Sequence, residues 1–157
     1  MAKTLVAYFS ATGSTSKIAE KVAKAADADI FEIKPAVPYK KEDLNWMDSK
    51  ARSTVEMNDP ASRPETAGTV ENMNQYDTVI IGFPIWWYVA PTIINTFLES
   101  YDFSGKKIAL FATSGSSGFG ETINRLSVSV DASAEFVSEK LMNRASDADI
   151  ESWVRSL

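Results

Sequence analysis

Short apolar runs of strand character alternate with segments of helical periodicity from one end of the chain to the other. The run at residues 78–83 is continuously apolar, which is typical of a strand buried on both faces of a parallel sheet. The other strand-like runs lie at residues 4–9, 30–33, 107–112 and 135–137, the last with a longer alternative that ends at Leu141. This alternation predicts an α/β protein with a parallel sheet.

Helical periodicity fills the intervals between these runs. Helices are predicted over residues 14–26 and 118–126, and behind Pro91, which suits a first helical position. Near the C-terminus, Ser146 and Asp149 have the spacing of a capping box, so a further helix is expected to begin there.

An irregular insertion at residues 35–67 interrupts the alternation. It contains four prolines and has too many residues for a plain connection. A helix is predicted over residues 41–57 within it, with extended loop beyond. The apolar residues that set this helical spacing are Leu44, Met47, Ala51 and Val55. Long loops in compact domains often cover a binding site. We therefore expect one domain over residues 1–157 with this insertion at its side.

The chain of 157 residues contains neither cysteine nor histidine. The absence of cysteine excludes disulfides, thiolate metal sites and thiol catalysis. The absence of histidine removes the usual general base and the commonest metal ligand. Any chemistry is therefore expected to belong to a bound cofactor, with no catalytic side chain and no metal site.

The formal net charge of -5 disfavours nucleic acid and favours a basic protein surface as a partner. No apolar stretch is long enough to cross a membrane, and a strand-like run follows Met1 too closely to leave room for a signal peptide. We expect a cytoplasmic protein without membrane contact.

The loop at residues 10–15 has the composition of a phosphate site. It joins a strand-like run to the start of a helix, where free N–H groups and the positive end of the helix dipole attract an anion. No Gly-Lys pair follows, as a nucleoside-triphosphate loop would require. Hydroxyls and amides suit a single terminal phosphate, although the loop alone could also be only a well-capped helix start.

Two further loops are expected at the same edge of the sheet, because ligands bind at the carboxyl ends of parallel strands. Residues 84–91 include Trp86 and Trp87, whose rings could stack on a flat ligand or serve as core or dimer-interface packing. Residues 113–120 are rich in glycine and serine, so a planar ring could approach the main chain closely. A phosphate at one end and a flat ring at the other describe flavin mononucleotide (FMN).

The sequence resembles the short-chain flavodoxins along its whole length. Ser10-Ala11-Thr12-Gly13-Ser14-Thr15 matches the family's phosphate signature. Gly82-Phe83-Pro84-Ile85-Trp86-Trp87, Arg63-Pro64 and Thr113-Ser114-Gly115-Ser116-Ser117-Gly118 are similar to a flavodoxin-like subfamily in bacteria. The resemblance implies a three-layer α/β/α sandwich with a five-stranded parallel sheet in the order 2-1-3-4-5.

The resemblance also implies FMN as cofactor and assigns three groups of binding residues. The phosphate would be held by Ser10, Thr12, Gly13, Ser14 and Thr15. The ring and ribityl chain would lie against Pro84, Ile85, Trp86 and Trp87. The third loop would contribute Thr113, Ser114, Gly115, Ser116 and Gly118. Electron-transfer flavodoxins usually carry acidic residues near the ring, whereas these loops have none before Glu121.

The sequence leaves two redox functions open. The first is an electron-transfer protein that docks a basic reductase or acceptor protein. The second is an FMN-dependent NAD(P)H:acceptor oxidoreductase of the quinone type, in which the insertion would form or close a cavity above the flavin. A third, weaker hypothesis is a binding or regulatory module that catalyses no reaction. Monomer and homodimer remain open. Trp153 is expected in the core, and Arg63 in a surface ion pair.

Overall fold

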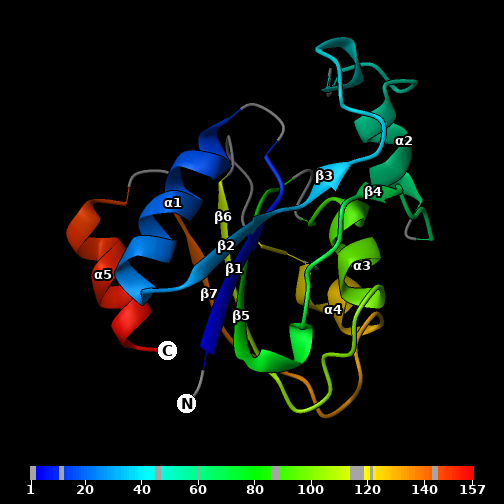
Figure 1. Ribbon diagram of the computed structural model, residues 1–157. Helices are drawn as coiled ribbons and strands as arrows, with labels where there is room; N and C mark the ends of the chain where they lie inside the picture. The colour runs from blue at the N-terminus through cyan, green and yellow to red at the C-terminus, as the bar shows by residue number, and fades with distance from the viewer. Residues whose placement is uncertain are drawn as a thin grey trace.

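The computed structural model describes residues 3–10, 13–44, 47–59, 61–85, 89–113, 119–120, 122–142 and 145–157. Its centre is a parallel sheet of five strands (Figure 1). The strands lie in the order β2 (Asp29–Glu32), β1 (Lys3–Tyr8), β5 (Tyr76–Pro84), β6 (Lys107–Thr113) and β7 (Glu135–Leu141). Counted within this sheet alone, the order is 2-1-3-4-5, so the predicted topology is confirmed.

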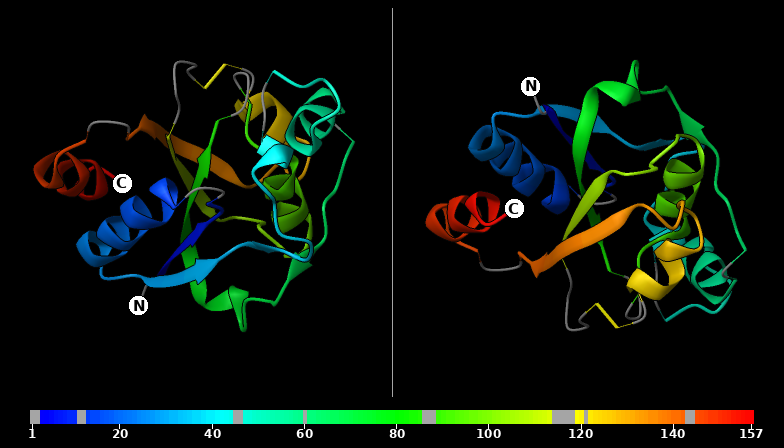
Figure 2. Two further views of the ribbon diagram at one scale, coloured as in Figure 1. Left: turned by 90° about the horizontal axis from the view of Figure 1, so that it is seen from above. Right: turned by 90° about the horizontal axis from the view of Figure 1, so that it is seen from below.

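Helices cover both faces of the sheet and complete three layers (Figures 1 and 2). Helices α1 (Ser14–Ala26) and α5 (Asp147–Arg155) lie on one face, and α3 (Thr92–Glu99) and α4 (Thr122–Ser127) lie on the other. The predicted capping box starts α5, because Ser146 Oγ accepts from the Asp149 backbone N–H at 3.1 Å while Ser146 N–H donates to Asp149 Oδ2 at 3.0 Å.

Alternate residues of the strands fill two apolar layers. Leu5 and Val79 belong to the layer under α3 and α4, whereas Val6 and Ile80 belong to the layer under α1 and α5. The central strand β5 is buried over most of its length, as its unbroken apolar run indicates. The sheet is therefore covered on both faces and presents its loops at the two ends of the strands.

The prediction of a helix over residues 41–57 is wrong. The insertion contains a short 3-10 helix, η1 (Glu42–Leu44), and a separate helix α2 (Arg52–Asn58). Asp48 Oδ1 accepts from the Lys50 backbone N–H at 2.9 Å, a local turn that competes with helix geometry. Met47 and Val55 are 74% and 52% exposed, so their apolar spacing does not mark a buried face.

The base of the insertion is closed by a two-stranded antiparallel sheet of β3 (Lys34–Pro35) and β4 (Thr66–Ala67), where Pro35 pairs with Thr66. A 3-10 helix, η2 (Met73–Gln75), then leads into β5. Sequence periodicity does not predict the small sheet or η2, because strands of two residues and a single helical turn contain too few positions to form a pattern.

The helix predicted over residues 118–126 begins later than expected, at Thr122 in α4. Gly120 has a φ of 49°, a left-handed conformation that a continuing helix does not allow. The backbone N–H of Thr122 donates to the Phe119 carbonyl at 2.9 Å and closes the turn before the helix. None of the helices in the described ranges is both long enough and apolar enough to span a membrane.

Tyr76 should make the fold sensitive to alkaline pH. Its hydroxyl donates to Asp29 Oδ2 at 2.7 Å, and burial together with this hydrogen bond raises the pKa of Tyr76 to about 12. The neutral phenol is thus favoured in the folded state, so its contribution is complete below pH 10 and is lost as the pH rises toward 12. In urea unfolding between pH 8 and about 12, Tyr76→Phe should lose stability less steeply than wild type. Identical pH slopes for the two proteins would contradict this assignment.

Candidate functional site

The carboxyl ends of β1, β5 and β6 are adjacent, so the three loops singled out in the sequence leave the sheet side by side. Phe9 N–H donates to the Gly82 carbonyl at 2.9 Å, just beyond the end of β1. Ile85 N–H donates to the Thr113 carbonyl at 2.8 Å, just beyond β5. These bonds place the starts of the three loops at one edge, as the rule for parallel sheets predicts.

The first loop leaves the N-terminus of α1 open for an anion. Gly13 occupies the N-cap with a φ of 95° and has no side chain with which to cap the helix. The first turn contains no acidic residue, so nothing there neutralises the positive end of the helix dipole. Gly13 N–H donates to Ser10 Oγ at 2.9 Å, and Ser16 Oγ donates to the Gly13 carbonyl at 2.8 Å. These bonds stay within the loop, while the uncapped start of the helix has the electrostatics that suit an anion.

Thr15 connects the first loop to the third. Its side chain is only 2% exposed, and its Oγ1 lies 3.0 Å from Thr113 Oγ1 at the end of β6. This hydrogen bond joins a residue predicted to hold the phosphate to a residue predicted to contact the ring. It sets the distance between the two parts of the candidate site.

The second loop begins inside the core. Pro84 pairs with Thr113 at the end of β5, and the Ile85 side chain is 6% exposed within the apolar layer under α3 and α4. The structure thus places Pro84 and Ile85 at the edge where the ring is expected, with the Ile85 side chain in the core layer.

Seven predicted site residues lie outside the described residues: Thr12, Trp86, Trp87, Ser114, Gly115, Ser116 and Gly118. The described site residues are Ser10, Gly13, Ser14, Thr15, Pro84, Ile85 and Thr113. These lie at one edge of the sheet. Their contacts with a cofactor stay predictions. In the described ranges, no group of three or more acidic side chains is arranged to hold a metal ion.

A cluster on the insertion packs against the start of the first loop. Tyr39 has its ring centroid 5.5 Å from that of Phe9, and its hydroxyl donates to the Glu56 carboxylate. The Arg52 guanidinium lies 3.9 Å from the centre of the Tyr39 ring, and Arg52 Nε bonds Glu56 Oε2 at 3.1 Å. Burial and the bond to Glu56 hold the pKa of Tyr39 well above its usual value.

Sequence reasoning missed this cluster. Arg52 and Glu56 are four residues apart, a spacing that indicates an ion pair on a helix. Nothing in the sequence connects either residue to Tyr39 or Phe9, because those contacts form between separate segments.

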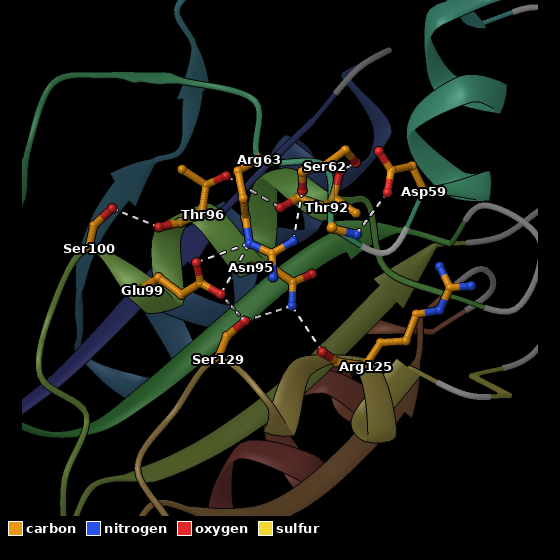
Figure 3. Close-up of polar contacts among 11 residues, drawn as sticks. Asp59, Ser62, Arg63, Thr92, Asn95, Thr96, Glu99, Ser100, Arg125 and Ser129 are labelled. Atoms are coloured by element: carbon orange, nitrogen blue, oxygen red, sulfur yellow. Dashed lines mark hydrogen bonds and ion pairs between the residues drawn. The ribbon is translucent and has the colours of Figure 1, made fainter.

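Arg63 forms the surface ion pair that the sequence predicts. Its Nε lies 3.0 Å from Glu99 Oε1 on α3, and Ser129 Oγ donates to the same carboxylate at 2.7 Å (Figure 3). These hydrogen bonds hold the pKa of Glu99 below its usual value. Beside them, buried Asn95 donates to the Arg125 carbonyl at 2.9 Å and connects α3 to α4. The Arg63–Glu99 pair thus attaches the insertion to the body of the protein.

Trp153 lies in the core, as predicted. It is 8% exposed, packs edge-on to Phe111, and donates from Nε1 to Ser138 Oγ at 2.9 Å. The contact joins α5 to the edge strand β7. It leaves no role for Trp153 in the site.

Comparison with known proteins identifies the family. No curated protein matches this sequence. A solved flavoprotein structure from Bacteroides eggerthii has a TM-score of 0.92 and 44% identity, covering 99% of this chain and 98% of that one. One from Bacteroides uniformis has a TM-score of 0.90 and 45% identity, covering 98% of each chain. A flavoprotein from Lactobacillus acidophilus, solved in complex with FMN, shares the fold at 22% identity and a TM-score of 0.71, covering 98% of this chain and 99% of that one. Residues 3–157 match the family model described as flavodoxin, and the chain belongs to the flavodoxin family.

Proposed function

We propose that this chain binds FMN at the carboxyl edge of its sheet and acts as an electron-transfer protein. The observation that carries the proposal is the open N-terminus of α1, where Gly13 leaves the helix without a side-chain cap and the first turn has no acidic residue. Membership of the flavodoxin family and the fold shared with an FMN-bound flavoprotein support the choice of ligand.

The described residues suit the two parts of this cofactor. Main-chain N–H groups in the first turn of α1 would bind the phosphate. The Thr15–Thr113 hydrogen bond keeps this turn beside the loop after β6, where the ring is expected. When bound, the flavin supplies the acceptance and donation of electrons. The protein binds and orients it and needs no histidine or cysteine for acid–base work.

The proposed partner is a reductase or acceptor protein with a basic docking face, because the chain carries a net charge of -5. Charge complementarity of this kind mainly raises the association rate and weakens with added salt. A cytoplasmic location stays a prediction.

A second candidate function is an FMN-dependent NAD(P)H:acceptor oxidoreductase. The observation that favours it is the position of the insertion, whose Tyr39 packs against Phe9 at the start of the phosphate loop. A wall beside the site would suit a small acceptor, such as a quinone, better than a protein. The lack of acidic residues at 84–91 and 113–120 also departs from the usual electron-transfer flavodoxins.

One anaerobic experiment separates these functions. The protein is loaded with FMN, its visible spectrum is recorded, and it is mixed with NADH and with NADPH. Slow or absent bleaching, together with a stable blue semiquinone on stepwise photoreduction, is expected for the electron carrier. Rapid direct bleaching by either nucleotide would favour the oxidoreductase. Failure to bind FMN would overturn both.

A further inference from the structure

Three contacts fix Tyr8 and Phe9, the last residues before the predicted phosphate loop. Phe9 N–H donates to the Gly82 carbonyl of β5 at 2.9 Å, and Ile33 N–H donates to the Tyr8 carbonyl at 2.6 Å. Ile33 lies between β2 and β3, where the chain enters the insertion. The third contact is that of the Tyr39 ring, whose centroid lies 5.5 Å from that of Phe9. Figure 1 shows the insertion at the end of the molecule where β1 ends and α1 begins.

The position of Phe9 sets the position of the turn that starts α1. Ser10 follows it directly, and Ser10 Oγ accepts from Gly13 N–H at 2.9 Å. The Gly13 carbonyl in turn accepts from Ser16 Oγ at 2.8 Å. A phosphate would bind the free N–H groups of this first helical turn. Donors that are already held in place bind more tightly, because they lose less conformational entropy when the ligand arrives.

The Tyr39 ring is itself held on the insertion by two charged side chains. The Arg52 guanidinium lies 3.9 Å from the centre of the ring, and the Tyr39 hydroxyl donates to the Glu56 carboxylate. Arg52 Nε lies 3.1 Å from Glu56 Oε2, so the three side chains contact one another in a closed triangle. Arg52 also donates from Nη1 to the Val37 carbonyl at 2.6 Å. The ring thus has a fixed orientation on Phe9.

The Arg52–Glu56 pair is unusual for an otherwise exposed segment. The two side chains are only 22% and 13% exposed. Among the residues of α2, which the structure describes in full, only Ser53 and Thr54 are buried. An ion pair that is mostly removed from water gains little net stability, because desolvation offsets the attraction between the charges. Its contribution is geometric, since it holds the Tyr39 ring against the body of the protein.

We propose that Tyr39 is a positioning residue for the phosphate of FMN: its ring, packed on Phe9, holds the first loop in the arrangement that presents the N-terminus of α1 to the phosphate. The inference rests on the proposed function, because it needs a phosphate at this helix. The insertion thereby acts on the phosphate end of the cofactor. It raises the selectivity of the protein for FMN over riboflavin, which has the same ring and no phosphate.

The test uses Tyr39→Leu, which removes the ring and the hydroxyl. The Kd values of FMN and riboflavin are measured by quenching of flavin fluorescence. The Kd of FMN should rise by about three- to tenfold, because the phosphate donors are no longer held in place. The Kd of riboflavin should stay within about twofold of wild type, because riboflavin does not use those donors. A general loss of folded protein would instead raise both Kd values together.

Two further variants examine the ring itself. Tyr39→Phe keeps the ring between Arg52 and Phe9, so its ratio of the two Kd values should stay within about twofold of wild type. A loss of selectivity as large as in Tyr39→Leu would overturn the role of the ring. Arg52→Met removes the guanidinium from the ring and should lower the selectivity by about twofold or more. This variant tests the inference even where Tyr39→Leu does not fold.

Tyr101→Leu is the matched control. Tyr101 is also partly buried, with its ring centroid 5.2 Å from that of Phe97 and its hydroxyl accepting from Val70 N–H at 2.7 Å. It follows the end of α3 that lies away from the candidate site. This variant should lose melting temperature to a similar extent as Tyr39→Leu and leave the selectivity for FMN unchanged.

A second measurement uses inorganic phosphate as the probe. Phosphate is titrated into the protein without flavin, and the backbone amide resonances of Thr15 and Ser16 in the first turn of α1 are followed by NMR. In wild type these resonances should shift with phosphate, and in Tyr39→Leu the shift should need about three- to tenfold more phosphate. Wild-type resonances that do not respond, or equal titrations of the two proteins, would count against the inference.

The results separate this inference from the proposed function. Equal changes of the two Kd values in Tyr39→Leu would overturn the positioning role while leaving FMN binding intact. Failure of wild type to bind FMN would overturn the proposed function and this inference together.

Discussion

Gly82→Ala is expected to destabilise the protein by about 3 kcal/mol or more, at or above the usual range for overpacking a core. Gly82 lies in β5 and pairs with Phe111 of β6, whose ring covers the position where a side chain would begin. An added Cβ would lie 2.1 Å from Phe111 Cζ and 2.3 Å from its Cε2. The ring is fully buried and packs against Trp153, so it cannot move aside without disturbing that layer.

Urea unfolding of four proteins measures this effect: wild type, Gly82→Ala, Phe111→Leu and the double variant. Because the smaller side chain makes room for the Cβ, the double variant should be more stable than the sum of the single changes predicts, by about 1 kcal/mol or more. Gly105→Ala is the control: its Cβ would meet open space, so only the strain of a φ of 72° remains, about 1–2 kcal/mol. Strict additivity in the cycle would show that the ring is not the cause.

Gly13→Asp is expected to weaken FMN binding by about ten- to a hundredfold, because a carboxylate would face the phosphate. The position lies at the N-cap of α1, and the space around its Cβ is open, so the substitution fits sterically. A φ of 95° strains any side chain placed there, so the variant also carries a backbone cost that an uncharged control must share. The effect on binding that exceeds this shared strain is electrostatic repulsion at the proposed phosphate site.

Gly13→Asn separates that repulsion from backbone strain. Asparagine has nearly the same shape as aspartate and tolerates a positive φ, such as the 95° of this residue. Fluorescence titration with FMN should give a Kd for the aspartate variant at least about fivefold above that of the asparagine variant. The difference should shrink as salt is added. Equal Kd values for the two variants would place the phosphate elsewhere.

The elements that the sequence predicts well are those made by neighbouring residues. The helix over residues 14–26 and the strands at 78–83 and 107–112 have long periodic or apolar runs, and the structure confirms each with changes only at the ends. The capping box of Ser146 and Asp149 needs only a spacing of three residues. The helix predicted over 41–57 failed because apolar spacing does not show whether any surface covers it, and Met47 and Val55 remain exposed.

In the candidate site, too, local features can be predicted from the sequence and contacts between distant segments cannot. The prediction of Ser10, Gly13 and Thr15 as phosphate residues needs only local information, because a strand, a hydroxyl-rich loop and a helix start follow one another in the sequence. The hydrogen bond between Thr15 and Thr113 could not be predicted from the sequence, because 98 residues separate the two side chains. The same holds for Tyr39 and Phe9, which no local pattern connects.

The sequence by itself determined the α/β class and the absence of histidine and cysteine side chains, and it predicted the phosphate loop, since each depends on residue type and local spacing. Only the tertiary structure decided where the insertion lies. Its position depends on contacts between distant segments, from Ser62 to Thr92 and from Arg125 to Met57. Burial likewise is a property of the folded chain rather than of any stretch of sequence, as the buried Thr54 on the insertion shows.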